Sequence, residues 1–199
     1  IAYVISRAGH ALIVLDTADL ANPVQELTGV LDGLNGPTAI AVSADDAFVY
    51  VTNAGDDSLS VYESDASDNL TLIQTLENAV DGVRGIAGAS DVALMEDDSY
   101  LVVAGQAENA LAVFERNATT GELSFVQMLR NDVGGAQGLL APSSLQVLGI
   151  ASPGNDTILV GSLGSPGVSG GIATFTSQAG GGVLPAPAVA LTSFGGVEA

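Results

Sequence analysis

The stretch 48–63, FVYVTNAGDDSLSVYE, decides the fold because its pattern occurs four times along the chain. It contains two short runs rich in Val and Tyr on either side of a Gly-Asp-Asp turn, which is typical of a β-hairpin. A hairpin pattern that returns at nearly constant spacing indicates a repeat architecture. The other three copies are YVIS with LIVLD at 3–6 and 12–16, VVAG with LAVFE at 102–105 and 111–115, and ILVG with IATF at 158–161 and 172–175.

Two further β-type runs complete each repeat. One run precedes most copies, at 38–43, 90–95 and 143–148, and another follows each copy, at 24–28, 70–74, 123–127 and 189–192. A unit of about 50 residues with four short antiparallel strands is a β-propeller blade. We therefore expect an all-β chain that forms a single propeller region over 1–199. Its repeats would span approximately 1–36 as a partial blade, then 37–87, 88–140 and 141–199.

The alternation of apolar residues predicts which side chains lie between blades. No window carries a helical stripe, and residues 80–86 are expected to make at most one loose turn. The hairpin at 162–171 is expected to be longer than its counterparts. The side chains predicted to be buried between blades are Ile40, Val42, Val49, Val51, Val61, Val92, Leu94, Val103 and Val113.

The second repeat also carries a family resemblance. Tyr50-Val51-Thr52-Asn53, preceded by PTAIAVSAD at 37–45 and followed by LSVY at 59–62, resembles the YVTN-repeat or lactonase-like β-propeller family. Members of that family usually close a ring of about seven blades, so about four blades would make an incomplete ring. We expect more polypeptide or a second copy to complete it. The alternative is a closed four-bladed propeller.

The charge of the chain limits its partners. The sequence has 23 Asp and Glu against 4 Arg and no Lys, for a net charge of -19. Such a surface repels phosphate backbones and anionic lipids, and no apolar run approaches the length of a membrane span. We therefore expect no nucleic-acid partner and no membrane insertion. An acidic chain without Cys, and hence without disulfides, suggests an extracellular or cell-surface protein of a prokaryote.

The acidic residues leave calcium open as a cofactor. The pairs Asp45-Asp46, Asp56-Asp57 and Asp97-Asp98 provide the oxygen ligands that calcium prefers. No EF-hand spacing is present, and the first and third pairs occupy equivalent turns, which explains them without metal. We expect no cofactor and assign no metal ligand, with calcium as the alternative.

Three groups are candidates for ligand binding. Arg7, His10 and Arg84 fall in loops that the blade order places at one mouth of the propeller, where they could hold an anionic ligand or transfer protons. No catalytic motif is present, so we assign no catalytic residue. The catalytic residues of the lactonase-like family cannot be matched one by one. With no Lys and one His, a phosphosugar substrate would be poorly served.

Two functions follow from these observations. The sequence favours a non-catalytic binding or scaffold segment for a protein or glycan partner, because catalytic clusters are lacking. The alternative, which the resemblance implies, is a lactonase-like hydrolase whose active site is completed by further blades.

Overall fold

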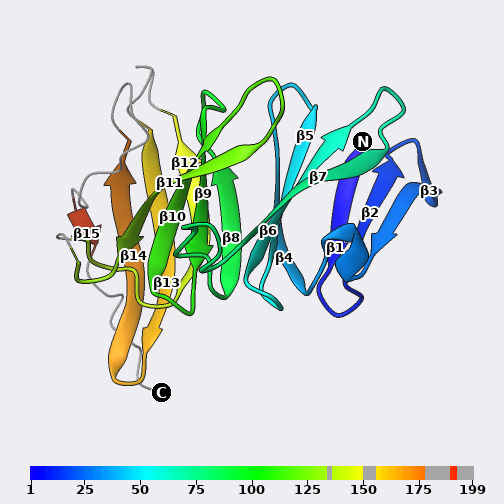
Figure 1. Cartoon of the computed structure of the whole chain (residues 1–199). Helices are drawn as coiled ribbons and strands as arrows, with labels where there is room; N and C mark the ends of the chain where they lie inside the picture. Colours follow the sequence, from blue (N-terminus) through cyan, green and yellow to red (C-terminus); the bar gives the residue numbers. More distant parts are fainter. Residues whose placement is uncertain (134–135, 150–155, 178–188, 192–199) are drawn as a thin grey trace.

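Four antiparallel sheets stand side by side in an arc (Figure 1). The structure is a computed structural model that describes residues 1–133, 136–149, 156–177 and 189–191 of the 199. Blade 1 has three strands in the order β1-β2-β3, and blades 2, 3 and 4 have four each. The predicted all-β propeller blades are confirmed, and the first blade lacks an inner strand.

The strands follow the predicted runs closely. Blade 1 contains β1 (Ala2–Ser6), β2 (Ala11–Asp16) and β3 (Asp19–Thr28). Blade 2 contains β4 (Pro37–Val42), β5 (Phe48–Asn53), β6 (Ser58–Ser64) and β7 (Leu70–Glu77). Blade 3 contains β8 (Ala89–Leu94), β9 (Tyr100–Gly105), β10 (Ala110–Arg116) and β11 (Leu123–Arg130). Blade 4 contains β12 (Pro142–Leu148), β13 (Thr157–Ser165), β14 (Val168–Thr176) and β15 (Val189–Leu191).

Equivalent strands pair in the same register. Tyr3 pairs with Val14 in blade 1, and Tyr50 pairs with Val61 in blade 2. The sequence repeat is thus a structural repeat. In the described part of the chain the helical structure is one short 3-10 turn, Val30–Asp32. No helix there is long and apolar enough to cross a membrane.

The core consists of three apolar layers, one in each seam between adjacent blades. Successive residues of a strand point to opposite faces, so β5 sends Val49 and Val51 to the seam with blade 1 and Phe48 and Tyr50 to the seam with blade 3. Five of the nine side chains predicted to be buried are 0% exposed, and Val92 is 6% exposed. The five are Val49, Val51, Val61, Val103 and Val113. The remaining three, Ile40, Val42 and Leu94, are half-buried and pack against the same layers.

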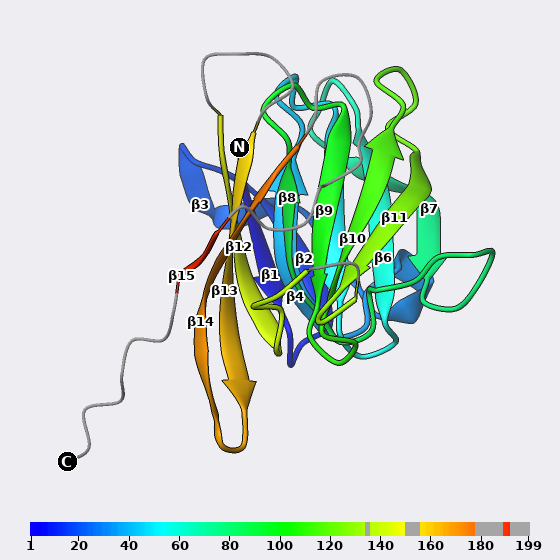
Figure 2. The same ribbon diagram turned by 90° about the vertical axis from the view of Figure 1, so that its left-hand side faces the viewer.

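The hairpin at 162–171 is longer than its counterparts, as expected, and its additional residues are paired, because β13 and β14 continue to Ser165 and Val168 and leave a tight turn. Figure 2 shows this hairpin extending past the neighbouring ones. The alternative of a closed four-bladed ring is wrong, since blades 1 and 4 lie at opposite ends of the arc (Figure 1). Residues 80–86 include one turn, closed by the Val83 N–H to the Val80 C=O (2.9 Å).

Hydrogen bonds across the seams repeat from blade to blade. At the outer edge the Gln25 amide accepts from the Leu70 N–H (2.6 Å) and donates to its C=O (3.0 Å). Gln74 contacts Leu123 in the same way, at 2.8 and 3.0 Å. An amide side chain can satisfy both groups of an edge residue at once. These outer clamps fix how far each blade is rotated against the next.

Candidate functional site

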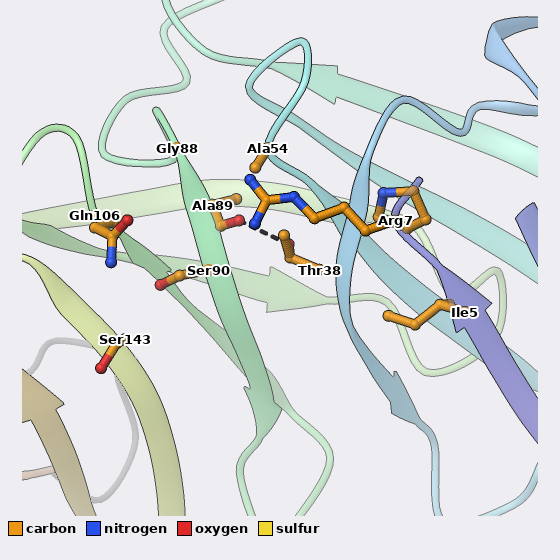
Figure 3. Close-up of a pocket in the computed structure, with 10 residues that line it drawn as sticks. Ile5, Arg7, Thr38, Ala54, Gly88, Ala89, Ser90, Gln106 and Ser143 are labelled. Carbon is orange, nitrogen blue, oxygen red and sulfur yellow. Dashed lines mark hydrogen bonds between the residues drawn. The ribbon is translucent and has the colours of Figure 1, made fainter. Parts of the chain in front are cut away.

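A cavity of about 360 Å³ lies at the mouth of the arc, where the inner strands begin. The mouth is the end of the propeller formed by two kinds of loop. One is the loop before each inner strand, called here the lead-in loop, and the other is the hairpin that follows β1, β5, β9 or β13. A cavity of this size can hold a small molecule. It is lined by Ile5, Arg7, Pro37, Thr38, Ala54, Gly88, Ala89, Ser90, Gln106 and Ser143 (Figure 3).

Hydroxyl groups at the start of each inner strand form the floor of the cavity. The Thr38 Oγ1 donates to the Ala89 C=O of the next blade at 2.7 Å, and the Ser90 Oγ donates to the Pro142 C=O at 2.8 Å. Each hydroxyl therefore satisfies a backbone carbonyl at the start of the neighbouring inner strand. A hydroxyl oxygen keeps lone pairs that can accept from a ligand.

Arg7 supplies the positive charge of the cavity. It begins the β1–β2 turn, which is closed by the His10 N–H to the Arg7 C=O (3.4 Å) and by the Gly9 N–H to the Ser6 Oγ (3.1 Å). In Figure 3 its side chain extends toward Ala89, above Thr38. No hydrogen bond or ion pair engages its guanidinium within the described residues. Its donors are thus available to a carbonyl oxygen or a carboxylate.

His10 is used by the fold. Its Nδ1 accepts the Gly36 N–H of blade 2 at 2.9 Å. In the next two repeats, Asp57 accepts from the Gly88 N–H (2.6 Å) and Asn109 from the Ala141 N–H (2.8 Å). All three acceptors have positive φ, between 48° and 57°. We call these three contacts the mouth latches, since each fixes a hairpin against the next lead-in loop.

The other predicted ligand group lies apart from the cavity. Arg84 is exposed in the lead-in loop of blade 3 and does not line the cavity, so the structure brings Arg7 and His10 into one turn and leaves Arg84 outside.

Arg116, in contrast, is buried in the core, where other side chains occupy its guanidinium. It is 7% exposed, its Nε donates to the Tyr50 hydroxyl at 2.7 Å, its Nη2 lies 3.7 Å from Asp45, and it stacks over Phe48. Burial raises the pKa of Tyr50. These contacts join blades 2 and 3, and they leave Arg7 as the charged side chain among the described lining residues.

The acidic pairs considered for calcium serve turns and seams. Asp45 accepts from Ser43 and from the Ala47 N–H, and these hydrogen bonds lower its pKa. Asp98 accepts the Ala44 N–H of the preceding blade at 2.6 Å. In the described ranges no three His, Asp or Glu side chains come together as metal ligands.

Of the residues that line the cavity, the sequence analysis named Arg7 as a candidate and did not name the neutral ones. Thr38, Ser90 and Ser143 repeat at the start of three inner strands, and this periodic hydroxyl was readable from the repeat alignment. Gln106 carried no such signal, because its counterpart in blade 2 is Ala54.

Comparisons with known proteins agree on one family. The family described as "Lactonase, 7-bladed beta-propeller" matches residues 2–135. A 6-phosphogluconolactonase of Bacillus subtilis is 27% identical over 132 residues, which cover 63% of this chain and 36% of the relative. An uncharacterized protein of Staphylococcus saprophyticus is 32% identical over 97 residues, 48% of this chain and 26% of that protein.

Solved structures show the same architecture. The periplasmic gluconolactonase of Pseudomonas aeruginosa superposes with a TM-score of 0.67 at 21% identity, over 94% of this chain and 52% of its own. A protein from Lactobacillus plantarum gives a TM-score of 0.71 at 17% identity, over 92% and 50%. The chain thus spans about half the length of these solved propellers.

These findings overturn the expectation of a non-catalytic binding or scaffold module. The matching family is described as a lactonase, and a curated relative with a named activity is a 6-phosphogluconolactonase, which favours the alternative that the sequence left open. The lack of a local catalytic motif was a poor guide, since a propeller mouth gathers its residues from loops about 50 residues apart. With residues 2–135 of its 199 matched and lactonase-like propellers as structural neighbours, the chain belongs to the seven-bladed β-propeller lactonase family.

Proposed function

We propose that the chain forms part of the active site of a lactone hydrolase, with Arg7 as the group that binds the reacting carbonyl. One observation carries the proposal: an unpaired guanidinium reaches into a small-molecule cavity whose other described walls are neutral. Membership of the lactonase family supports the reaction class.

The chemistry suits this arrangement. Hydrolysis adds water to the ester carbonyl carbon, places negative charge on the carbonyl oxygen, and then breaks the ring C–O bond to give a hydroxycarboxylate and a proton. A guanidinium beside the carbonyl stabilises first the oxyanion and then the carboxylate. The hydroxyl of Ser143 and the amide of Gln106 can hold hydroxyl groups of the ring.

The described lining of the cavity is assigned a binding role. Its described residues include no carboxylate and no imidazole, so we assign them carbonyl binding and oxyanion stabilisation. The proton acceptor for the attacking water is assigned to groups outside this lining. His10, whose Nδ1 holds Gly36, positions the turn that carries Arg7.

The test is lactone hydrolysis by the complete gene product, followed by acid release in a pH-stat with glucono-1,5-lactone. We expect Arg7→Gln to lower kcat/KM by about 100-fold or more, the usual loss when an oxyanion donor is removed. Arg84→Gln removes the same charge from an exposed loop and should leave kcat/KM nearly unchanged.

Two results would contradict the proposal. The first is a wild-type rate equal to the uncatalysed rate for every lactone tried. The second is equal kcat/KM for Arg7→Gln and the wild type. Unchanged circular dichroism spectra of both variants would exclude misfolding as the cause of a loss.

A further inference from the structure

Arg7, Ala54 and Gln106 occupy one repeated position, directly after the equivalent strands β1, β5 and β9 of blades 1, 2 and 3. The Ala54 N–H donates to the Gly36 C=O (3.1 Å), and the Gln106 N–H donates to the Gly88 C=O (3.3 Å). Arg7 shares the position because each of the three precedes a mouth-latch residue by three places. We call this the rim position. In blade 4 it is Leu163, whose N–H donates to the Ala141 C=O (3.0 Å).

The fold does not dictate the side chain at the rim position. One backbone position carries a cation, a methyl group, an amide and an aliphatic chain in four blades. A packing position in the same lead-in loops behaves differently, since Leu34, Ile86 and Leu139 are all large, aliphatic and fully buried. The backbone contact therefore leaves the side chain at the rim position available to contact a ligand.

Arg7 and Gln106 face the cavity from two sides. Figure 3 shows Arg7 on one side, Gln106 with Ser143 on the other, and Thr38, Ala89 and Ser90 between them. If the reacting carbonyl lies at Arg7, the substituent on the far side of the lactone ring meets Gln106 and Ser143. Both are uncharged.

The number of positive charges then limits the substrate. An unphosphorylated hydroxycarboxylate has one negative charge, which one arginine neutralises. A phosphorylated one adds a phosphate of nearly two charges, which proteins bind with arginine clusters or lysine. Within the described lining Arg7 is the one cation, and the side opposite it offers a phosphate only the neutral Gln106 and Ser143, on a chain with a net charge of -19.

We propose that Gln106 is a specificity-determining residue, and that its neutral amide selects an uncharged hydroxyl substituent over a phosphate. The substrate class is thus an uncharged polyhydroxylated lactone. This inference rests on the proposed lactone hydrolysis, since it takes the carbonyl to lie at Arg7.

The experiment changes Gln106 to arginine, which the same rim position already carries in blade 1. The control is Gln137→Arg, the same substitution in the lead-in loop of blade 4, at an exposed position that corresponds to Arg84. kcat/KM is measured on the complete gene product for glucono-1,5-lactone and its 6-phosphate. The wild type should prefer the unphosphorylated lactone. Gln106→Arg should raise the phosphorylated-to-unphosphorylated ratio by about tenfold or more, as a charge-assisted hydrogen bond would, and Gln137→Arg should not change it.

A wild-type preference for the phosphorylated lactone would overturn the inference, as would equal ratios for the two variants. Binding of gluconate and 6-phosphogluconate, measured by calorimetry, separates this outcome from failure of the proposed function. If no lactone is hydrolysed, the proposed function fails, and the preference for the two acids still decides the role of Gln106.

Discussion

The mouth latch at Asp57 allows the energy of one seam contact to be divided into two parts. Its carboxylate accepts the Gly88 N–H at 2.6 Å, and its φ is 57°. A hydrogen bond to a charged acceptor contributes about 1.5–3 kcal/mol to the free energy of unfolding. Because Asp57 is partly exposed, we take about 1.5 kcal/mol for this one. Left-handed backbone costs a residue with a Cβ about 1 kcal/mol, which glycine avoids. Asp57 already bears this backbone cost, so we expect losses of about 1.5 kcal/mol for Asp57→Ala, about 0.5 kcal/mol for Asp57→Gly, and under about 0.5 kcal/mol for Asp57→Asn.

The measurement is equilibrium unfolding of the chain in urea, followed by far-UV circular dichroism. Asp57→Asn should be mild because Asn109 performs the same role in the next blade. The control is Asp56→Gly, since Asp56 is exposed and accepts only from Ser58 among the described residues. Equal stabilities for the Ala and Asn variants would refute the latch, and an Ala variant no weaker than the Gly variant would refute the backbone contribution.

Three further predictions concern stability. Val51→Asp should cost at least about 3 kcal/mol, because Val51 is 0% exposed in the seam between blades 1 and 2, and an unchanged melting temperature would mean that the register is wrong. Burial raises the pKa of Asp91, so the folded state loses stability as pH rises through that pKa. Asp91→Asn can still accept the Leu145 N–H and should therefore be more stable than the wild type at pH 7. This difference in stability should disappear below about pH 4, where the carboxyl group is protonated in both states. A gain that is the same at both pH values would contradict it. Gln74→Ala should destabilise the chain by about 1–2 kcal/mol in the same urea assay, because both backbone groups of the buried Leu123 lose their partner; a Gln74→Ala chain as stable as the wild type would argue against the outer clamp.

Much of the fold could be predicted because the repeat is local. Each blade is four consecutive strands, so the alternation around Val51 and its counterparts specifies both the strands and the seams that they fill. The additional pairing within the β13–β14 hairpin was not predicted, because its Gly and Ser residues are typical of a loop, whereas in the structure they pair.

The site was harder to predict because it depends on contacts between repeats. Arg7 and Ser143 are distant in sequence and meet only when the blades are placed side by side. His10 attracted attention as the single imidazole, yet its role is that of Asp57 and Asn109, which only the hydrogen bonds to the lead-in loops reveal. Gln106 becomes meaningful once the rim position is defined by backbone contacts.

The claim that matters most is that the mouth cavity binds the acid group of its ligand through Arg7. The chain has four arginines and no lysine, so side-chain Nε–Hε signals in a ¹⁵N-labelled sample give one resonance for each arginine. We expect titration with gluconate to shift the Arg7 resonance, assigned through the Arg7→Gln variant, and to leave Arg84, Arg116 and Arg130 in place. An Arg7 resonance that does not move at saturating gluconate, or an equal shift of the exposed Arg84, would contradict the account.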